Sequence, residues 1–142
     1  MAFENQVQIP VTDYNRAIAS VDCTGATPIT AFTVTGDVVF KVIGVTKISC
    51  TSDGAITAEV GVTGQTAKFI AQIADAKNLV QNQIWHDNDP DETIELSSVW
   101  NEFIVSTGQD IILTTTGTFT DGDIDFYCFW YPLSEDGNVV AA

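Results

Sequence analysis

The sequence predicts an all-β fold, an antiparallel β-sandwich of jelly-roll type with about eight to ten strands. Threonine and valine are abundant, whereas the 3.6-residue periodicity of an amphipathic helix is scarce. Short runs of alternating apolar and polar residues are separated by glycine, aspartate and asparagine. Turn residues at intervals of roughly 8–12 residues are typical of sandwiches and barrels.

The length of the chain suits one domain. Its 142 residues, of which 45% are hydrophobic, can bury one core without disulfides or metals. We expect residues 16–142 to form a single β-sandwich and residues 1–15 to form an extended N-terminal arm. Pro10 argues against a central strand in the arm. The apolar residues of the arm alternate with polar ones and are Phe3, Val7, Ile9 and Val11.

Strand segments follow one another along the rest of the chain. A single helical turn is expected over 74–78, a strand or a loop over 79–85, a polar loop over 86–92 and a tail over 133–142. The expected strands are 17–23, 29–34, 38–51, 56–62, 66–73, 93–98, 102–106, 110–116 and 123–131.

Two of these strands have faces of different character. In segment 38–51 one parity is predicted to face the core, and it contains Val38, Phe40, Val42, Ile48 and Cys50. Gly44, in mid-run, suggests a bulge or a bend. The other parity of this segment is half apolar with two cations and carries Val39, Lys41, Ile43, Val45 and Lys47.

The final strand has the clearest alternation. Its predicted core residues are Ile124, Phe126, Cys128 and Trp130. Its opposite face combines three aromatic rings with two carboxylates, so we expect part of that face to be covered. That face carries Asp123, Asp125, Tyr127, Phe129 and Tyr131.

The charge of the chain is large, negative and unevenly distributed. The formal net charge is −14. Residues 1–77 hold all five cations and seven acids, whereas residues 78–142 hold twelve acids and neither lysine nor arginine. Such a surface repels phosphate groups, so we expect neither nucleic acid nor an anionic membrane as a partner. The charge is explained by solubility at high protein concentration.

We expect the protein to be made in a cytoplasm. Residues 1–5 have neither the basic region nor the apolar core of a signal peptide, and no apolar run is long enough to span a bilayer.

Cys23, Cys50 and Cys128 are widely spaced, and no CxxC or Cys/His cluster exists. Free, buried thiols are therefore expected, and zinc is not.

The sequence lacks the convergent groups that catalysis needs. His86 is the only histidine, and no nucleophile motif surrounds Cys50 or the serines at 97 and 98. We expect His86 to be a turn residue, and we predict no enzyme activity, no catalytic residue and no cofactor. Three acids at the start of the last strand fit a protected sheet edge better than a glycosidase pair; they are Asp121, Asp123 and Asp125.

Two further clusters have a functional and a structural interpretation. Acids in the loop 87–92 can surround Ca²⁺, but Pro90 interrupts the run and the glycine and final glutamate of an EF-hand are missing. A solvated acidic loop is the better interpretation, so we predict no metal. For the tryptophans, core or interface packing is favoured over a sugar-stacking platform. The residues concerned are Asp87, Asp89, Asp91, Glu92, Trp85, Trp100 and Trp130.

The C-terminal segment has a distinctive motif. Over residues 127–140 it reads Tyr-Cys-x-Trp-x-Pro-Leu-Ser-x-Asp-Gly-x-Val-Val, and in this it resembles small tailed-bacteriophage virion proteins. Residues 32–38, and 59–72 together with 84–87, resemble early and middle segments of the same family. The resemblance covers most of residues 15–142, and it transfers no known site residue.

The resemblance implies a capsid decoration, or cement, protein that binds the outer shell of a phage particle and stabilises it. The implied partners are the major capsid protein and further copies of the chain, with a trimer favoured, and the implied location is the outer surface of the virion. The alternative function is a receptor- or glycan-binding module of a head or tail fibre.

Two segments are candidates for contact with the capsid or with another subunit. The arm can add to a neighbour as a strand, and the mixed face of 38–51 can meet an acidic capsid surface while the acidic half faces solvent. The alternatives are a floppy arm and an apolar face that is the second layer of the sandwich. The candidate interface residues are Phe3, Val7, Ile9, Val39, Lys41, Ile43, Val45 and Lys47.

Overall fold

The computed structural model describes residues 14–91 and 101–142. The regular secondary structure of the described residues consists of ten strands and one 3-10 turn. In order they are β1 (Asn15–Asp22), β2 (Ile29–Thr35), β3 (Val38–Thr51), β4 (Ala58–Val62), β5 (Gln65–Ile73), η2 (Ala76–Asn78), β6 (Ile84–Trp85), β7 (Phe103–Val105), β8 (Ile111–Thr115), β9 (Asp121–Pro132) and β10 (Asn138–Ala141).

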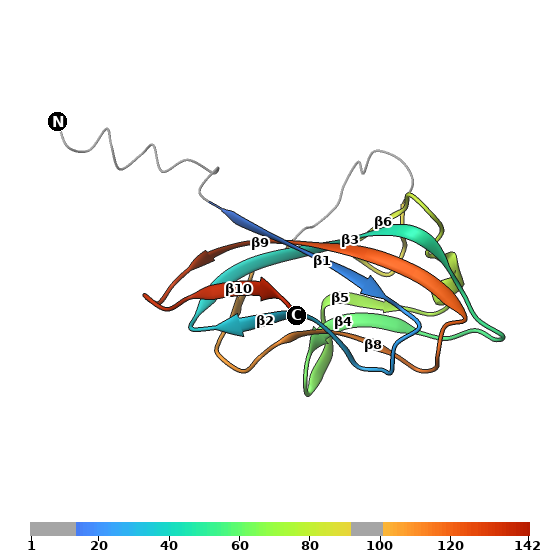
Figure 1. The fold of residues 1–142 in the computed structure, drawn as a ribbon, viewed down its shortest axis with the longest axis horizontal. Coiled ribbons are helices and arrows are strands. Elements are labelled where there is room, and N and C mark those ends of the chain that lie inside the picture. The colour runs from blue at the N-terminus through green and yellow to red at the C-terminus, as the bar shows by residue number, and fades with distance from the viewer. Residues whose placement is uncertain (1–13, 92–100) are drawn as a thin grey trace.

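The strands form two antiparallel sheets that lie one above the other (Figure 1). The first sheet has the order β1-β9-β3-β6, and β7 also pairs with β3. The second sheet has the order β10-β2-β8-β4-β5. The all-β prediction is confirmed, and two facing antiparallel sheets are consistent with a β-sandwich. In the described residues no helix is long and apolar enough to cross a membrane.

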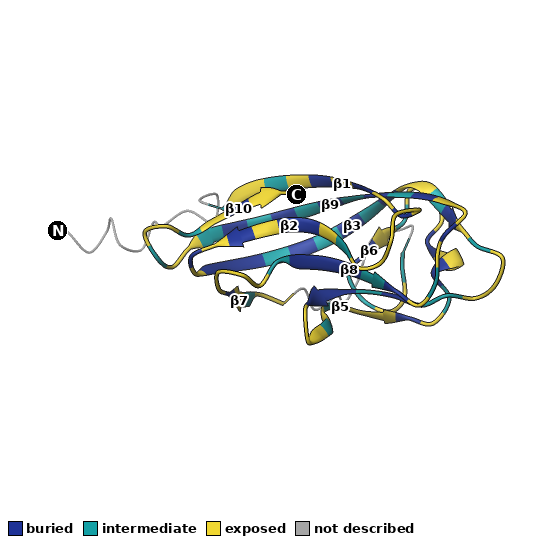
Figure 2. Ribbon diagram, turned by 60° about the horizontal axis from the view of Figure 1, so that its bottom comes forward, coloured by how far each residue is buried: buried dark blue, intermediate teal, exposed yellow. Residues whose placement is uncertain are grey.

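The core lies between the sheets and is built from the inward-facing residues of the long strands (Figure 2). The alternation predicted for the final strand is confirmed, because its four core residues, Ile124, Phe126, Cys128 and Trp130, are at most 8% exposed. On β3, Phe40 pairs with Trp130 and Val42 pairs with Cys128, and both β3 residues are also buried.

The far end of β3 differs from the prediction. Ile48 was expected in the core, but 43% of it is exposed. The pairing of β3 with β9 shifts between Thr46 and Ile48, and this bulge reverses the direction of the side chain. Gly44, where a bulge was predicted, pairs regularly with Phe126. Its role is close packing, because a Cβ at this position would lie 3.1 Å from both Ile124 and Phe126.

The segment 133–142 was predicted to be a tail, and this prediction is wrong. Strand β10 within it pairs with β2, and Val139 faces Val34 and is buried. The turn that brings β10 back packs against the turn between β2 and β3. Gly36 in that second turn has a φ of 63°, and a Cβ on it would lie 2.5 Å from a carboxylate oxygen of Asp136. Glycine tolerates this backbone conformation and this close approach, which other residues do not.

The remaining predictions are mostly confirmed within a few residues. Segment 79–85 contributes only the two-residue strand β6, and the helical turn predicted over 74–78 is the 3-10 turn η2. The predicted strand 93–98 and residues 1–13 of the arm predicted over 1–15 lie outside the described residues, whereas Asn15 already belongs to β1, because it pairs with Trp130 of β9.

We expect Thr46→Val to stabilise the protein by about 1 kcal/mol. Thr46 is fully buried, and its hydroxyl has no hydrogen-bond partner among the described residues. Valine keeps the shape and removes the unpaired polar group. The midpoint of urea unfolding should therefore rise. The matched control is Thr115→Val, which removes a hydroxyl that donates to the Gly117 carbonyl at 2.7 Å. The control should lower the midpoint, and a fall for both variants would contradict this account.

Candidate interaction site

The outward side of the first sheet is the surface that brings most of the predicted interface residues together. Neighbouring strands place their outward residues in rows across the sheet. One such row contains Ile18, Tyr127 and Ile43, and the next contains Arg16, Phe129 and Lys41. We call this surface the outer face. Its residues are Arg16, Ile18, Ser20, Val39, Lys41, Ile43, Val45, Lys47, Ile84, Ile104, Asp123, Asp125, Tyr127, Phe129 and Tyr131.

The middle of the outer face is apolar. Ile43, Tyr127 and Phe129 are half-buried there by their neighbours on the sheet. Two large apolar side chains nearer the margins reach further into solvent, because Ile18 is 42% exposed and Ile104 is 71% exposed. Apolar side chains that adjoin one another across neighbouring strands make the outer face a candidate for contact with another protein.

Both lysines of the outer face lie close to carboxylates of the same chain. Lys47 Nζ lies 3.7 Å from Asp125 Oδ2, and the Ser20 hydroxyl donates to Asp125 Oδ1 at 2.7 Å. Nearer the other end of β3, Lys41 Nζ lies 3.6 Å from Glu102 Oε1. Both cations predicted to meet an acidic capsid surface therefore already have acidic partners in their own chain.

Tyr14, the first described residue, joins the pair of Lys41 and Glu102. Its hydroxyl donates to Glu102 Oε1. Its ring packs edge-on against Tyr131 at a centroid distance of 5.3 Å, and Lys41 Nζ lies 5.9 Å from the ring centroid. The hydrogen bond to Glu102, helped by some burial and by the negative charge, raises the pKa of Tyr14 to about 12.

We expect Glu102→Gln to lower the pKa of Tyr14 from about 12 toward the ordinary tyrosine value. A raised phenol pKa means that the contact stabilises the fold at pH values below about 10 and that this contribution is lost as the pH rises toward 12. Titration of the tyrosine Cζ resonances by NMR measures the shift. Glu135→Gln removes the same charge from an exposed position and should leave Tyr14 unchanged. An unaltered Tyr14 titration in Glu102→Gln would refute the assignment.

The structure distributes the predicted interface residues unevenly. Val39 is buried, Lys41, Ile43 and Val45 are half-buried, and Lys47 is exposed. Phe3, Val7 and Ile9 lie outside the described residues. The outer face also contains residues that were not predicted as interface. They come from β1, β6, β7 and β9, and the aromatic alternation of residues 127–131 was a signal for those of β9 alone.

Part of the acidic second half of the chain, residues 78–142, also lies on the outer face. Asp123 and Asp125, which were expected to face solvent with the rest of that half, share the outer face with the lysines. Pairing of β9 with β3 brings them there. The net charge of the outer face is therefore close to neutral, whereas that of the whole chain is −14.

The groups considered for chemistry form no metal-holding cluster in the part of the chain that the structure describes. No three His, Cys, Asp or Glu side chains there are grouped so that they could hold a metal ion. His86 Nδ1 lies 3.8 Å from Asp87 Oδ2. The three cysteines are free and buried. Burial raises the pKa of the Cys128 thiol to about 12, so this thiol is protonated at neutral pH.

No protein-family model, no curated protein and no solved structure matches this chain. The function is therefore inferred from the outer face and from the chemistry of its residues.

Proposed function

We propose that the protein is a structural component of a tailed-bacteriophage particle, a capsid decoration protein that attaches to the outer shell through its outer face. The assignment to a phage particle rests on the resemblance of residues 127–140, and the observation that carries attachment is the apolar, aromatic middle of the outer face, with charged residues around it. Protein-binding surfaces have this arrangement, in which aromatic residues lie at the centre and polar residues at the rim.

The pairing of charges determines what kind of shell surface fits. Lys41 and Lys47 already neutralise Glu102 and Asp125, so an acidic capsid surface would gain little from them. We therefore propose that attachment depends mainly on apolar burial around Ile43 and Tyr127. The strong negative charge of the rest of the chain keeps the protein soluble and discourages non-specific association.

We also propose that the sandwich is a jelly roll, a fold used by viral capsid domains and by lectins. The order of pairing supports this topology. β1 pairs with β9, β2 with β8, β3 with β7 and β4 with β5. The first half of the chain thus pairs, in reverse order, with the second half, as in a long hairpin folded over on itself.

The alternative of a glycan-binding fibre module has less support. It depended on an exposed tryptophan on which a sugar ring could stack. Trp85 is fully buried, and Trp130 is only 8% exposed. Trp100 lies outside the described residues. A trimer on the capsid stays part of the proposal, and its subunit contacts are not assigned to residues.

The proposal is tested by adding purified protein to phage particles that lack it and measuring binding and resistance to heat. We expect the protein to bind these particles, and we expect their capsids to fail at a higher temperature than capsids without it. Ile18→Asp on the outer face should weaken binding on the order of tenfold or more. Val140→Asp on β10 is the matched control, because Val140 is 48% exposed and lies on the second sheet. Equal binding by both variants, or none by the unmodified protein, would overturn the proposal.

A further inference from the structure

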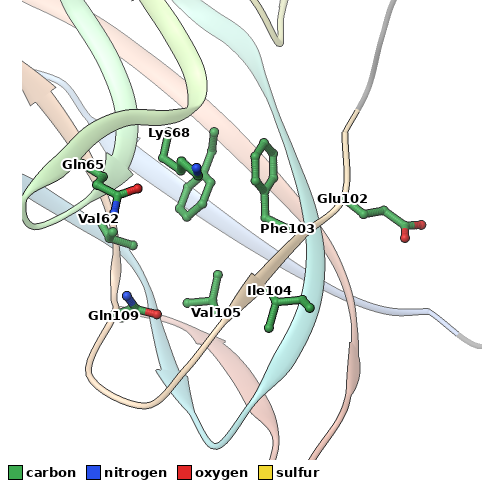
Figure 3. A pocket seen from close by; sticks show the side chains of 9 residues that line it. Val62, Gln65, Lys68, Glu102, Phe103, Ile104, Val105 and Gln109 are labelled. Atoms are coloured by element: carbon green, nitrogen blue, oxygen red, sulfur yellow. The ribbon is translucent and has the colours of Figure 1, made fainter.

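A groove of about 470 Å³ opens between the two sheets, beside β5 and β7 (Figure 3). Apolar side chains from both sheets line it, and they are Val62, Phe69, Phe103, Ile104 and Val105. Gln65, Lys68 and Gln109 lie around them. Phe69 and Phe103 pack at a centroid distance of 5.1 Å, so the sandwich continues under the groove.

Two strand edges border this groove. β5 is the last strand of the second sheet. Among the described strands, β7 pairs with β3 and with no other. Each edge therefore offers backbone donors and acceptors to an added strand. A segment that fits must be extended, with apolar side chains on one parity for the groove and polar ones on the other for solvent.

Residues 3–11 of the chain have this pattern apart from Asn5, which is polar on the apolar parity. Phe3, Val7, Ile9 and Val11 share one parity, whereas Glu4, Gln6 and Gln8 share the other. Pro10 lacks an amide donor, which is tolerated in a strand added at an edge.

The arm joins β1 at Tyr14, and the position of Tyr14 favours binding of the arm in the groove of its own molecule rather than in that of another copy. A row of outer-face residues leads from the start of β1 to β7. Tyr14 packs on Tyr131, Tyr131 pairs with Val39, and Val39 pairs with Ile104. Ile104, at the end of this row and also a lining residue, is the most exposed large apolar residue described, at 71%.

The length of the arm is sufficient for this path. Three strand spacings separate β1 from β7, which is roughly 14 Å, or about four to five extended residues. Thirteen residues precede Tyr14. About eight of them therefore remain for the groove once the arm has crossed the sheet.

We propose that the arm crosses the outer face along this row and adds to the groove as an extended strand in its own molecule. Phe3 and Val7 fill the groove, while Ile9 and Val11 cover Ile104. This inference concerns the isolated protein and is tested without capsids; the arm then covers Ile104 at one end of the outer face and leaves Ile18, Ile43 and Tyr127 for the shell.

Hydrogen exchange in the full chain tests the proposal. We expect Phe3→Asp with Val7→Asp to speed exchange of the β7 amides by tenfold or more, because the added strand is lost. The matched control is Gln6→Asp with Gln8→Asp, which adds the same charge on the solvent parity and should change exchange at β7 less than twofold. Equal exchange rates in both double variants would overturn the proposal.

A photo-crosslinking residue at position 3 identifies which molecule binds the arm. We expect crosslinks to residues 62–69 or 103–109 within one chain. Mixing isotopically labelled and unlabelled protein distinguishes this result from exchange of arms. Crosslinks between labelled and unlabelled chains, or crosslinks confined to the second sheet's outward side, would refute docking in the same molecule.

Discussion

Replacement of Gly61 by alanine is expected to destabilise the protein by about 3 kcal/mol or more. A Cβ on Gly61 would lie 2.1 Å from the carbonyl oxygen of Gln65 and 2.6 Å from backbone atoms of Thr66. These are backbone atoms of β5, and no side-chain rotation relieves the clash. The strand β5 must therefore move away from β4, and the groove beside it widens.

Thermal unfolding measures this effect, and a fall in Tm of roughly 10 °C is expected for a domain of this size. Gly54→Ala is the matched control, because no atom lies within 4 Å of a Cβ at that position. The control should change the free energy of unfolding by less than about 0.5 kcal/mol. If the two alanine variants unfold at the same temperature, the close approach of β4 and β5 is wrong.

Phe40→Ala is expected to cost about 3–5 kcal/mol of folding free energy. Phe40 is fully buried on β3, and its ring meets that of Phe69 from the second sheet edge-on at a centroid distance of 4.5 Å. Phe103 completes the cluster, at 6.1 Å from Phe40. Loss of the central ring leaves a cavity between the sheets and removes favourable aromatic contacts.

Urea unfolding of Phe40→Ala and Phe103→Ala distinguishes the central ring from the peripheral one. Phe103 is only half-buried at the side of the groove, so its removal should cost about half as much. A loss for Phe103→Ala as large as that for Phe40→Ala would mean that the cluster is not organised around Phe40.

The regular parts of the fold were predictable because alternation of apolar residues encodes which side of a strand is buried. This holds for Ile124–Trp130 in β9 and for Phe40 and Val42 in β3. The bulge that exposes Ile48 was not predictable, since it depends on how β3 pairs with a strand far along the chain. Strand β10 was missed because its four residues contain only Val139 as a buried residue.

The interaction site was predictable only in part, for a related reason. The outward parity of β3 identified Lys41, Ile43 and Lys47 as surface residues of mixed character. Their neutralisation by Glu102 and Asp125 depends on sheet order, which brings β9 and β7 to either side of β3. Local patterns in a sequence carry no information on such pairing between distant segments.

Cryo-electron microscopy of intact phage particles tests the central claim most directly, because it reveals which surface of the protein meets the shell. We expect density for the sandwich on the outside of the capsid, with Ile18, Ile43 and Tyr127 facing the major capsid protein. Density in which the second sheet faces the shell and the outer face is exposed would contradict the account, as would particles that lack the protein entirely.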